Sequence, residues 1–277
     1  MLYDLHTHTK ASDGVLTSKQ LIDKAVNLEL LGIAITDHDT VSGIQEALDY
    51  QLQCRCHLEV IPAIEMNTEN ANYEVHILGY YIDHHNSNLC TRLEELKESR
   101  LKRAIDMIKK LRAMGYNITF EQVRQIAGND LIARPHIAQA LVHNNCVFSI
   151  KEAFDKLIGR GRPAYVPRYK FLPQEAIKLI KSAGGIAVLA HPGLIGSQLI
   201  IDEIIAAGIE GIEVYYPEHS PQQTDKYINL TYRHNLLVTG GSDYHGLGGE
   251  EVASRLGLTG ISQEMMIRIK NYHNKFR

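Results

Sequence analysis

The chain opens on the stretch Tyr3-Asp4-Leu5-His6-Thr7-His8, which runs on into Thr9-Lys10-Ala11-Ser12-Asp13-Gly14. Side chains two residues apart on a β-strand point to the same face, so His6 and His8 project together. Two adjacent imidazoles make half of a metal site. In a chain with 14 histidines, one such pair is weak evidence by itself. It gains weight only if other strands also end in potential ligands.

The bulk composition is that of a globular protein. Hydrophobic residues make up 44% of the 277 positions, enough for one large core or for a core with a smaller second one. The net charge of -3 creates no basic field, so long duplex nucleic acid is not an expected partner. With no leader-like or membrane-spanning apolar run, we expect a cytoplasmic protein that does not associate with membranes.

The four cysteines show neither zinc-ribbon spacing nor the density of a disulfide scaffold. We therefore expect Cys54, Cys56, Cys90 and Cys146 to be free thiols in a reducing compartment.

Short apolar strands alternate with amphipathic helices at both ends of the chain. Helical spacers between strands are typical of parallel pairing and of the α/β class. A capping box at Thr17 and Gln20 marks the start of the first helix. The seven expected strands begin near residues 3, 33, 60, 73, 185, 211 and 236.

Residues 96–165 break this alternation because they contain helical patterns and no strand. Leu101, Ala104, Ile105, Ile108 and Leu111 repeat with the helical period, and Gly115 ends that pattern. We predict two domains: a barrel formed by residues 1–95 and 166–277, and an all-helical insertion at 96–165 that covers the active site.

Potential metal ligands come after nearly every expected strand. The carboxyl ends of parallel barrel strands converge on one opening, so such side chains should meet there. More imidazoles and carboxylates are present than one ion can use, which points to two or three divalent ions. Without thiolates, this donor set favours manganese, with iron or zinc as alternatives. The candidates are His6, His8, Asp13, His38, Glu65, His76, His191, Asp243 and His245.

Several divalent ions in one pocket can activate a bridging water as hydroxide and can clamp the oxygens of a phosphoryl group. The expected reaction is therefore phosphoester hydrolysis.

These motifs, in this order, resemble the polymerase and histidinol phosphatase (PHP) superfamily. The resemblance rests on Asp4-Leu5-His6-Thr7-His8, Thr36-Asp37-His38-Asp39, Ala190-His191-Pro192 and Gly241-Ser242-Asp243-Tyr244-His245, together with Glu65 and His76. It implies a distorted (β/α)7 barrel similar to a TIM barrel. The insertion and the segment Ala133-Arg134-Pro135-His136 resemble one branch in particular. That branch removes the 3′-phosphate of 3′,5′-bisphosphonucleotides, and some of its members trim short RNA from the 5′ end.

The resemblance also implies three ligand sets. His6, His8, Glu65 and Asp243 would hold one ion, and Glu65, His76 and His191 a second. The third set is Asp13, His38 and His245.

Cations that are not ligands are candidates for binding the substrate phosphate. Arg134 precedes Pro135 at an expected helix start, where a guanidinium and free backbone N–H groups can meet an anion. Basic residues outnumber acidic ones over residues 97–112. This run is either a solvated helix face or a place where Arg100 or Arg103 turns inward to a second phosphate. His219 is either a phosphate contact and leaving-group acid or a surface histidine.

Three other functions stay open at this point. A histidinol-phosphate phosphatase or another small-metabolite phosphatase would use the same barrel. An amidohydrolase-type C–N hydrolase also opens with His-x-His, although it uses fewer ligands. A non-catalytic metal-binding module would need a partner to serve.

Overall fold

The computed structural model describes residues 2–71, 73–128, 132–167, 169–246 and 255–275. The chain divides into two compact units. We call Met1–Cys90 together with Lys170–Arg277 the barrel unit, and Thr91–Tyr169 the helical unit. The domain limits expected from the sequence, and the covering of the active site by the insertion, stay predictions.

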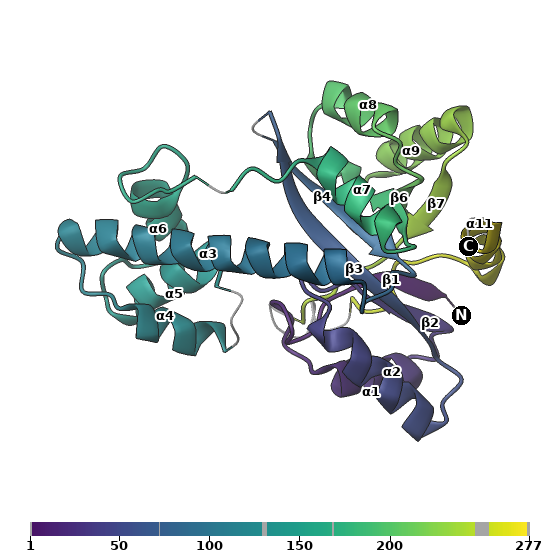
Figure 1. Ribbon diagram of the computed structural model, residues 1–277, viewed down its shortest axis with the longest axis horizontal. Helices are drawn as coiled ribbons and strands as arrows, with labels where there is room; N and C mark the ends of the chain where they lie inside the picture. The colour runs from purple at the N-terminus through teal and green to yellow at the C-terminus, as the bar shows by residue number, and fades with distance from the viewer. Residues whose placement is uncertain (1, 72, 129–131, 168, 247–254, 276–277) are drawn as a thin grey trace. The chain divides into compact units, whose positions relative to one another are not determined.

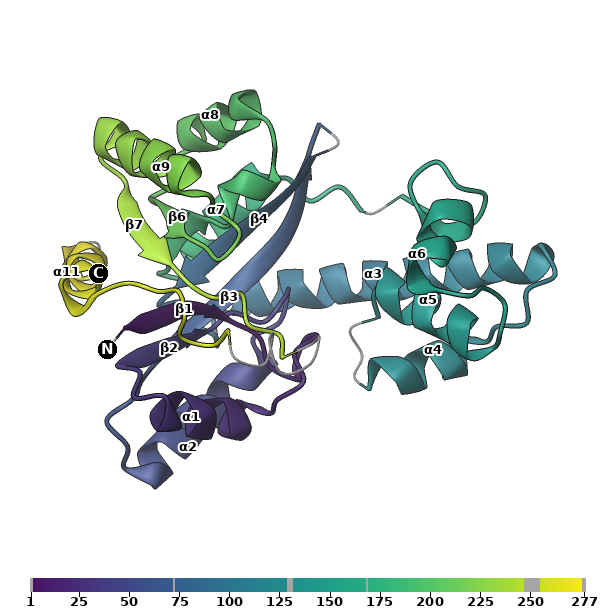
Figure 2. The same cartoon turned by 180° about the vertical axis from the view of Figure 1, so that it is seen from behind.

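The described strands of the barrel unit form one seven-stranded sheet in which spatial order follows chain order. Its edges approach each other, since β1 contacts β7 and Thr7 forms a parallel bridge with Tyr244 (Figure 2). The predicted α/β class and the distorted barrel are thereby confirmed. The strands are β1 (Tyr3–Thr7), β2 (Gly32–Ile35), β3 (Glu59–Asn70), β4 (Tyr73–Tyr80), β5 (Ile186–Leu189), β6 (Gly211–Tyr215) and β7 (Leu237–Gly240).

We expected all the strands to pair in parallel, and this prediction is wrong for β4. This strand runs antiparallel to both β3 and β5, whereas the other neighbouring strands pair in parallel. The reason is the connection, because two residues separate β3 from β4 and no helix can cross over in so short a loop. β3 also continues beyond Glu65, where we expected it to end, and pairs with β4 up to Asn70.

Amphipathic helices cover the outside of the barrel strands. In Figure 1, α1 and α2 lie together beside β2, while α7, α8 and α9 lie beside the later strands. The capping box predicted at Thr17 is present, because its hydroxyl accepts from the Gln20 N–H and the Gln20 side chain caps Thr17 in return. The helices described in this unit are α1 (Ser18–Asn27), α2 (Ser42–Cys54), α7 (Pro173–Ser182), α8 (Gln198–Ala206), α9 (Pro221–His234) and α11 (Gln263–Lys275), with a 3₁₀ turn at Pro192–Leu194.

The turn after α2 corrects our expectation for the cysteines. Cys54 and Cys56 form a disulfide, while Cys90 and Cys146 are free thiols. Arg55 between them takes a left-handed conformation with φ of +51°, and the two Cα atoms lie 5.3 Å apart. That separation falls within the range that a disulfide can bridge.

The helical unit has a hydrophobic core of its own. Within the predicted stripe, Ala104, Ile108 and Leu111 are buried there, whereas Leu101 is exposed. No helix in the described part of the chain has both the length and the apolar character needed to cross a membrane. The elements that contribute to this unit are α3 (Ser87–Ala113), α4 (Phe120–Ala127), α5 (Arg134–His143), α6 (Ile150–Ala153) and a π-helical turn at Phe154–Ile158.

The core of the helical unit predicts different costs for two leucines of the same helix. Leu111 is 0% exposed and Leu101 is 36% exposed. Leu111→Ala leaves a cavity, so we expect the free energy of unfolding to fall by about 2–5 kcal/mol. Leu101→Ala should cost less than about 1 kcal/mol. Urea denaturation followed by circular dichroism measures both losses, and equal losses would contradict this packing.

Candidate metal centre

All the side chains predicted as metal ligands lie in the barrel unit, and the structure brings them together into one cluster. Three groups of donor atoms within it could each hold an ion. They share members: Glu65 belongs to two groups, and so do His8 and His38.

Backbone pairing between neighbouring strand ends explains how distant residues meet. β3 extends past the end of β2, so His38 bridges Glu65, and the Asp39 N–H donates to the Glu65 carbonyl at 2.9 Å. On the other edge, the His8 N–H donates to the Tyr244 carbonyl at 2.9 Å. This closure places the residues after β7 beside those at the end of β1.

Gly241 permits that closure. A Cβ atom there would lie 2.4 Å from both the backbone nitrogen and the Cβ of His6. Only a glycine lets the chain cross β1 at this distance.

The first donor group is the predicted set His6, His8, Glu65 and Asp243. The His6 Nε2 atom lies 3.2 Å from Glu65 Oε2 and 3.3 Å from Asp243 Oδ1. The corresponding distances from His8 Nε2 are 3.3 and 3.1 Å. Both imidazoles and Glu65 are fully buried.

The second donor group consists of Glu65, His76 and His38. The Glu65 Oε1 atom lies 2.8 Å from His76 Nδ1, and Oε2 lies 2.9 Å from His38 Nδ1. His191, which we predicted for this set, is not in the group, although its Nε2 atom lies 3.1 Å from Oε1. His76 reaches this place from within β4 and not from a strand end, because the antiparallel direction of β4 puts its first half beside Glu65.

The third donor group contains the predicted Asp13, His38 and His245, together with His8. The shortest contact joins His245 Nε2 to Asp13 Oδ1 at 3.2 Å, and His38 Nε2 lies 3.9 Å from Asp13 Oδ2. The rings of His8 and His245 are stacked, with their centroids 4.0 Å apart. Asp13 is the most exposed of these donors.

The orientation of the donor atoms fits a metal centre. Two ligands of one ion, each about 2.0–2.2 Å from it, lie roughly 3.0–3.5 Å apart at tetrahedral or octahedral angles. The N–O separations of the first group fall in this range. Several donor atoms of the cluster are buried and make no hydrogen bond, as expected if they point to a common metal ion. These atoms are His6 Nε2, His8 Nε2, His38 Nδ1, Glu65 Oε2 and Asp243 Oδ1.

The charges of the cluster favour cations strongly. Burial would raise the pKa of Glu65, but the charges of His38 and His6 hold it well below its usual value. For His8, the neighbouring carboxylates of Asp243 and Glu65 outweigh burial and raise the pKa to about 10. Positive charge is therefore held here either as protons on the imidazoles or as metal ions that replace them.

Comparison with known proteins agrees with this geometry. The PHP domain family matches residues 4–195. The chain belongs to the PHP family.

Relatives of this PHP domain are similar over most of their length. A 5′-3′ exoribonuclease, Rnm, of Escherichia coli is 34% identical over 250 residues, covering 88% of this chain and 85% of the relative. A 3′,5′-nucleoside bisphosphate phosphatase of Chromobacterium violaceum is 34% identical over 257 residues and 90% of each chain. The crystal structure of a predicted metal-dependent phosphoesterase of Bifidobacterium adolescentis aligns with a TM-score of 0.82 at 31% identity, over 96% of this chain and 94% of that one.

Glu213 is a buried residue beside the metal centre that we did not predict from the sequence. It is fully buried on β6, with Oε1 3.0 Å from His6 Nδ1, and its Oε2 accepts the His191 N–H at 2.8 Å. A carboxylate behind a ligating imidazole orients the ring and raises its basicity. The sequence did contain a sign of this role. Glu213 is the single acidic residue inside the apolar strand Gly211–Tyr215, and a buried charge there needs a partner.

Asp37 is a second residue that we missed. Its carboxylate accepts hydrogen bonds from the Thr9 N–H at 2.7 Å, the Thr9 hydroxyl at 2.7 Å and the Ser12 hydroxyl at 2.6 Å. It therefore holds the loop that carries Asp13.

Three of the four predicted substrate contacts belong to the helical unit. Arg100, Arg103 and Arg134 belong to the helical unit, where Arg103 Nε donates to the Val166 carbonyl at 2.7 Å. The Arg134 guanidinium lies over the Phe154 ring, 5.5 Å from its centroid. Their contacts with substrate stay predictions.

His219 has both ring nitrogens occupied within the barrel unit. Nδ1 lies 2.9 Å from the Val214 carbonyl, and Nε2 accepts the Gly193 N–H at 3.1 Å. This arrangement fixes the neutral ring with its proton on Nδ1. The roles predicted for His219, leaving-group acid and phosphate contact, would require these bonds to break, and both stay predictions.

The sharing of Glu65 predicts unequal losses of metal. Asp13→Ala removes a donor from the third group only, so part of the bound metal should remain. Glu65→Ala removes the carboxylate common to two groups and should abolish most binding. The metal-to-protein ratio after dialysis, measured by inductively coupled plasma mass spectrometry, checks both outcomes. Full metal retention by Asp13→Ala would contradict its role as a ligand.

The position of Glu213 predicts a change in metal affinity without loss of a ligand. Glu213→Gln weakens the support of His6, so metal affinity should fall by about 10–100-fold. Glu210→Gln is the matched control, because Glu210 bonds to Tyr272 and to the Ala187 N–H and not to the cluster. Competition with a fluorescent chelator measures both affinities, and equal affinities for the two variants would count against Glu213.

Proposed function

We propose that this PHP domain is a metal-dependent phosphoesterase that removes the 3′-phosphate of 3′,5′-bisphosphonucleotides. The observation that supports this most is the set of three donor groups joined through Glu65, His8 and His38. Joined groups hold ions near one another, and neighbouring divalent ions suit phosphoryl transfer. The relative from Chromobacterium violaceum, named for this activity, is 34% identical over 90% of the chain.

We propose that two or three ions bind, with manganese preferred and iron or zinc as alternatives. Imidazole and carboxylate donors without thiolate suit these metals. When bound, the ions supply an activated water and neutralise charge on the phosphoryl group.

The residues of the chain have separate tasks in this proposal. Glu65 joins the first and second groups, and Asp243 joins the first group to the pocket beside it. Glu213 keeps His6 in its orientation, and the Tyr216 hydroxyl donates to Asp243 Oδ2 at 3.1 Å. Asp243 is thereby held while its other oxygen faces His6 and His8.

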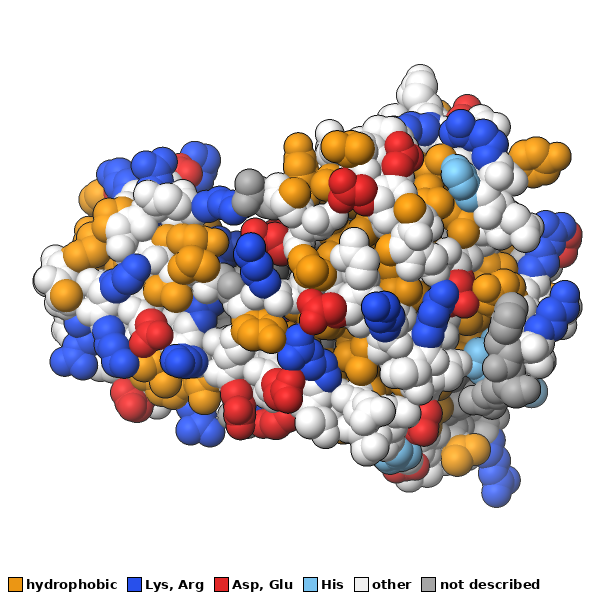
Figure 3. Space-filling view, turned by 45° about the horizontal axis from the view of Figure 1, so that its top comes forward, with side chains coloured by type: hydrophobic (Ala, Val, Ile, Leu, Met, Phe, Trp, Pro, Cys, Tyr) orange, Lys and Arg blue, Asp and Glu red, His pale blue; other side chains and the backbone are white. Residues whose placement is uncertain are grey.

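A nucleotide substrate is favoured by charge as well as by the relatives. Lys and Arg side chains are spread over the helical unit, at the left of Figure 3. Lys and Arg are the side chains that pair with phosphate groups. We propose that Arg134 contacts such a substrate, with Arg100 or Arg103 as a contact to a second phosphate.

Trimming of short RNA from its 5′ end is a second candidate function. The Escherichia coli relative, named a 5′-3′ exoribonuclease, is 34% identical over 88% of this chain. The same donor groups could serve a terminal phosphodiester, so the two activities compete for one site.

A substrate panel tests the proposal. Manganese-reconstituted protein is assayed for phosphate release from adenosine 3′,5′-bisphosphate, histidinol phosphate and p-nitrophenyl phosphate, and for nucleotide release from short 5′-phosphorylated RNA. We expect the bisphosphate to give the highest kcat/KM, and chelator or Glu65→Ala to abolish turnover. Preference for histidinol phosphate would contradict the proposed substrate, and metal binding without any turnover would contradict the proposed reaction.

The proposed role of Arg134 predicts a loss of activity without a loss of metal. Arg134→Ala should lower kcat/KM for the bisphosphate by roughly 10–100-fold, because one charge-assisted contact with phosphate is lost. The metal-to-protein ratio should stay unchanged, since Arg134 is not a donor. Lys151→Ala, at an exposed site of the same unit, is the control. Loss of metal in Arg134→Ala would show that its role is misassigned.

A further inference from the structure

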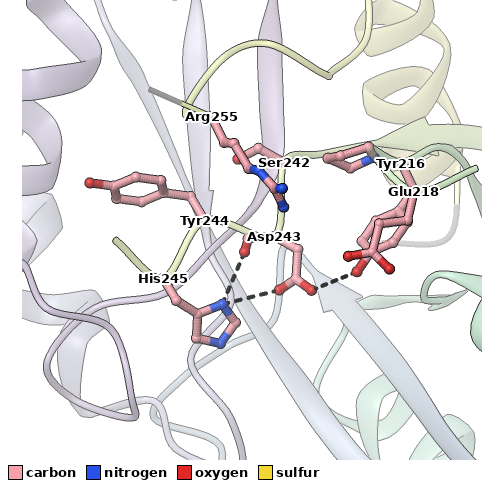
Figure 4. Close-up of a pocket in the computed structure, with 8 residues that line it drawn as sticks. Tyr216, Glu218, Ser242, Asp243, Tyr244, His245 and Arg255 are labelled. Atoms are coloured by element: carbon pink, nitrogen blue, oxygen red, sulfur yellow. Dashed lines mark hydrogen bonds and ion pairs between the residues drawn. The ribbon is translucent and has the colours of Figure 1, made fainter. Parts of the chain in front are cut away.

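A pocket opens beside the metal centre within the barrel unit (Figure 4). Its volume is about 270 Å³, which is enough for a phosphate group and part of an attached molecule. Asp243 and His245, which belong to the first and third donor groups, line this pocket. An anion in the pocket would therefore lie beside the side chains proposed to hold the ions.

Arg255 is the only lysine or arginine among the described residues that line the pocket. In Figure 4 its side chain extends toward Asp243, with Glu218 on the other side of Asp243. No hydrogen bond or ion pair joins its guanidinium to another described residue. An exposed arginine that is directed into a pocket next to buried carboxylates, with no partner among the described residues, is suited to a ligand with negative charge.

The backbone around Arg255 is anchored to the same loop that carries Asp243. The buried Asp4 carboxylate accepts the Ser242 N–H at 2.8 Å through Oδ1 and the Gly257 N–H at 2.9 Å through Oδ2. The Leu258 N–H also donates a hydrogen bond to the Arg255 carbonyl at 3.0 Å, which closes a turn next to Gly257. One side chain of β1 thus sets the position of Arg255 relative to Asp243.

Asp4 itself is not placed to act on a substrate. Burial raises its pKa to about 6, and its hydrogen bonds from Ser242 and Gly257 limit the rise. It is fully buried, and its oxygens are occupied by the backbone of the two segments that it joins. Its task is to position them.

We propose that Arg255 binds the phosphoryl group that is hydrolysed. This inference rests on the proposed phosphoesterase function. Glu218 is the other charged side chain of the pocket outside the donor groups, and it repels phosphate from its own side. The anion therefore sits between Arg255 and the donor groups. There the planar guanidinium can donate two parallel hydrogen bonds to phosphate oxygens.

Direct binding of inorganic phosphate tests this assignment without turnover. In isothermal titration calorimetry on the manganese-loaded protein, Arg255→Ala should bind phosphate about 10–100-fold more weakly than wild type. Arg255→Lys should bind with intermediate affinity, because it keeps the charge and loses the planar fork. Arg268→Ala, which removes the same charge from an exposed position of α11, is the matched control and should bind as wild type does. The metal-to-protein ratio should be the same in all four proteins.

Kinetics separate the reacting phosphoryl group from a second phosphate. Arg255→Ala should lower kcat/KM for p-nitrophenyl phosphate and for adenosine 3′,5′-bisphosphate alike, by roughly 100-fold. An effect on the bisphosphate alone would overturn the assignment, because Arg255 would then hold the phosphate that does not react. Wild-type affinity for inorganic phosphate in Arg255→Ala would also overturn it.

These outcomes can be told apart from failure of the proposed function. A wild-type protein that hydrolyses no phosphomonoester, yet binds phosphate in a manner that depends on Arg255, would refute the reaction and keep the anion site.

Discussion

The carboxylate of Glu65 lies buried in the barrel unit, where five imidazoles approach its two oxygens. His6, His8 and His38 face Oε2, while His76 and His191 face Oε1. A buried carboxylate is costly unless cations and hydrogen bonds compensate for the lost water. The five rings come from four strands or strand ends, so this one group requires the strands to converge. Metal binding and barrel closure are consequences of the same constraint.

Other buried carboxylates fix the positions of the strand ends and loops that carry the metal ligands. Glu213 joins His6 to the backbone of His191, and Asp37 holds the loop before Asp13. Asp4 ties the loop after β7 to Gly257. Glu213 and Asp4 each accept from two separate segments, whereas Asp37 accepts from the single segment that contains Thr9 and Ser12. Groups of this kind hold ligands in position so that little reorganisation is needed when an ion or a substrate binds.

Periodicity and local chemistry were sufficient to predict most elements. The capping residue Thr17 begins a helix as expected, because a cap depends on a neighbour three residues away. The direction of β4 was not predictable in this way. Strand direction depends on the length of the connection, and an interpretation that ended β3 at Glu65 left room for a crossover that does not exist.

The sequence by itself determined the class of the fold, the family and the identity of the clustered donors, because each of these depends on residue types at short spacings. Only the tertiary structure decided which donors share Glu65, that His38 and His8 each serve two groups, and that Glu213 and Arg255 stand beside them. Some of those relations join residues more than two hundred positions apart, as with the 207 positions between His6 and Glu213. They arise from strand pairing and barrel closure, which no local pattern of side chains records.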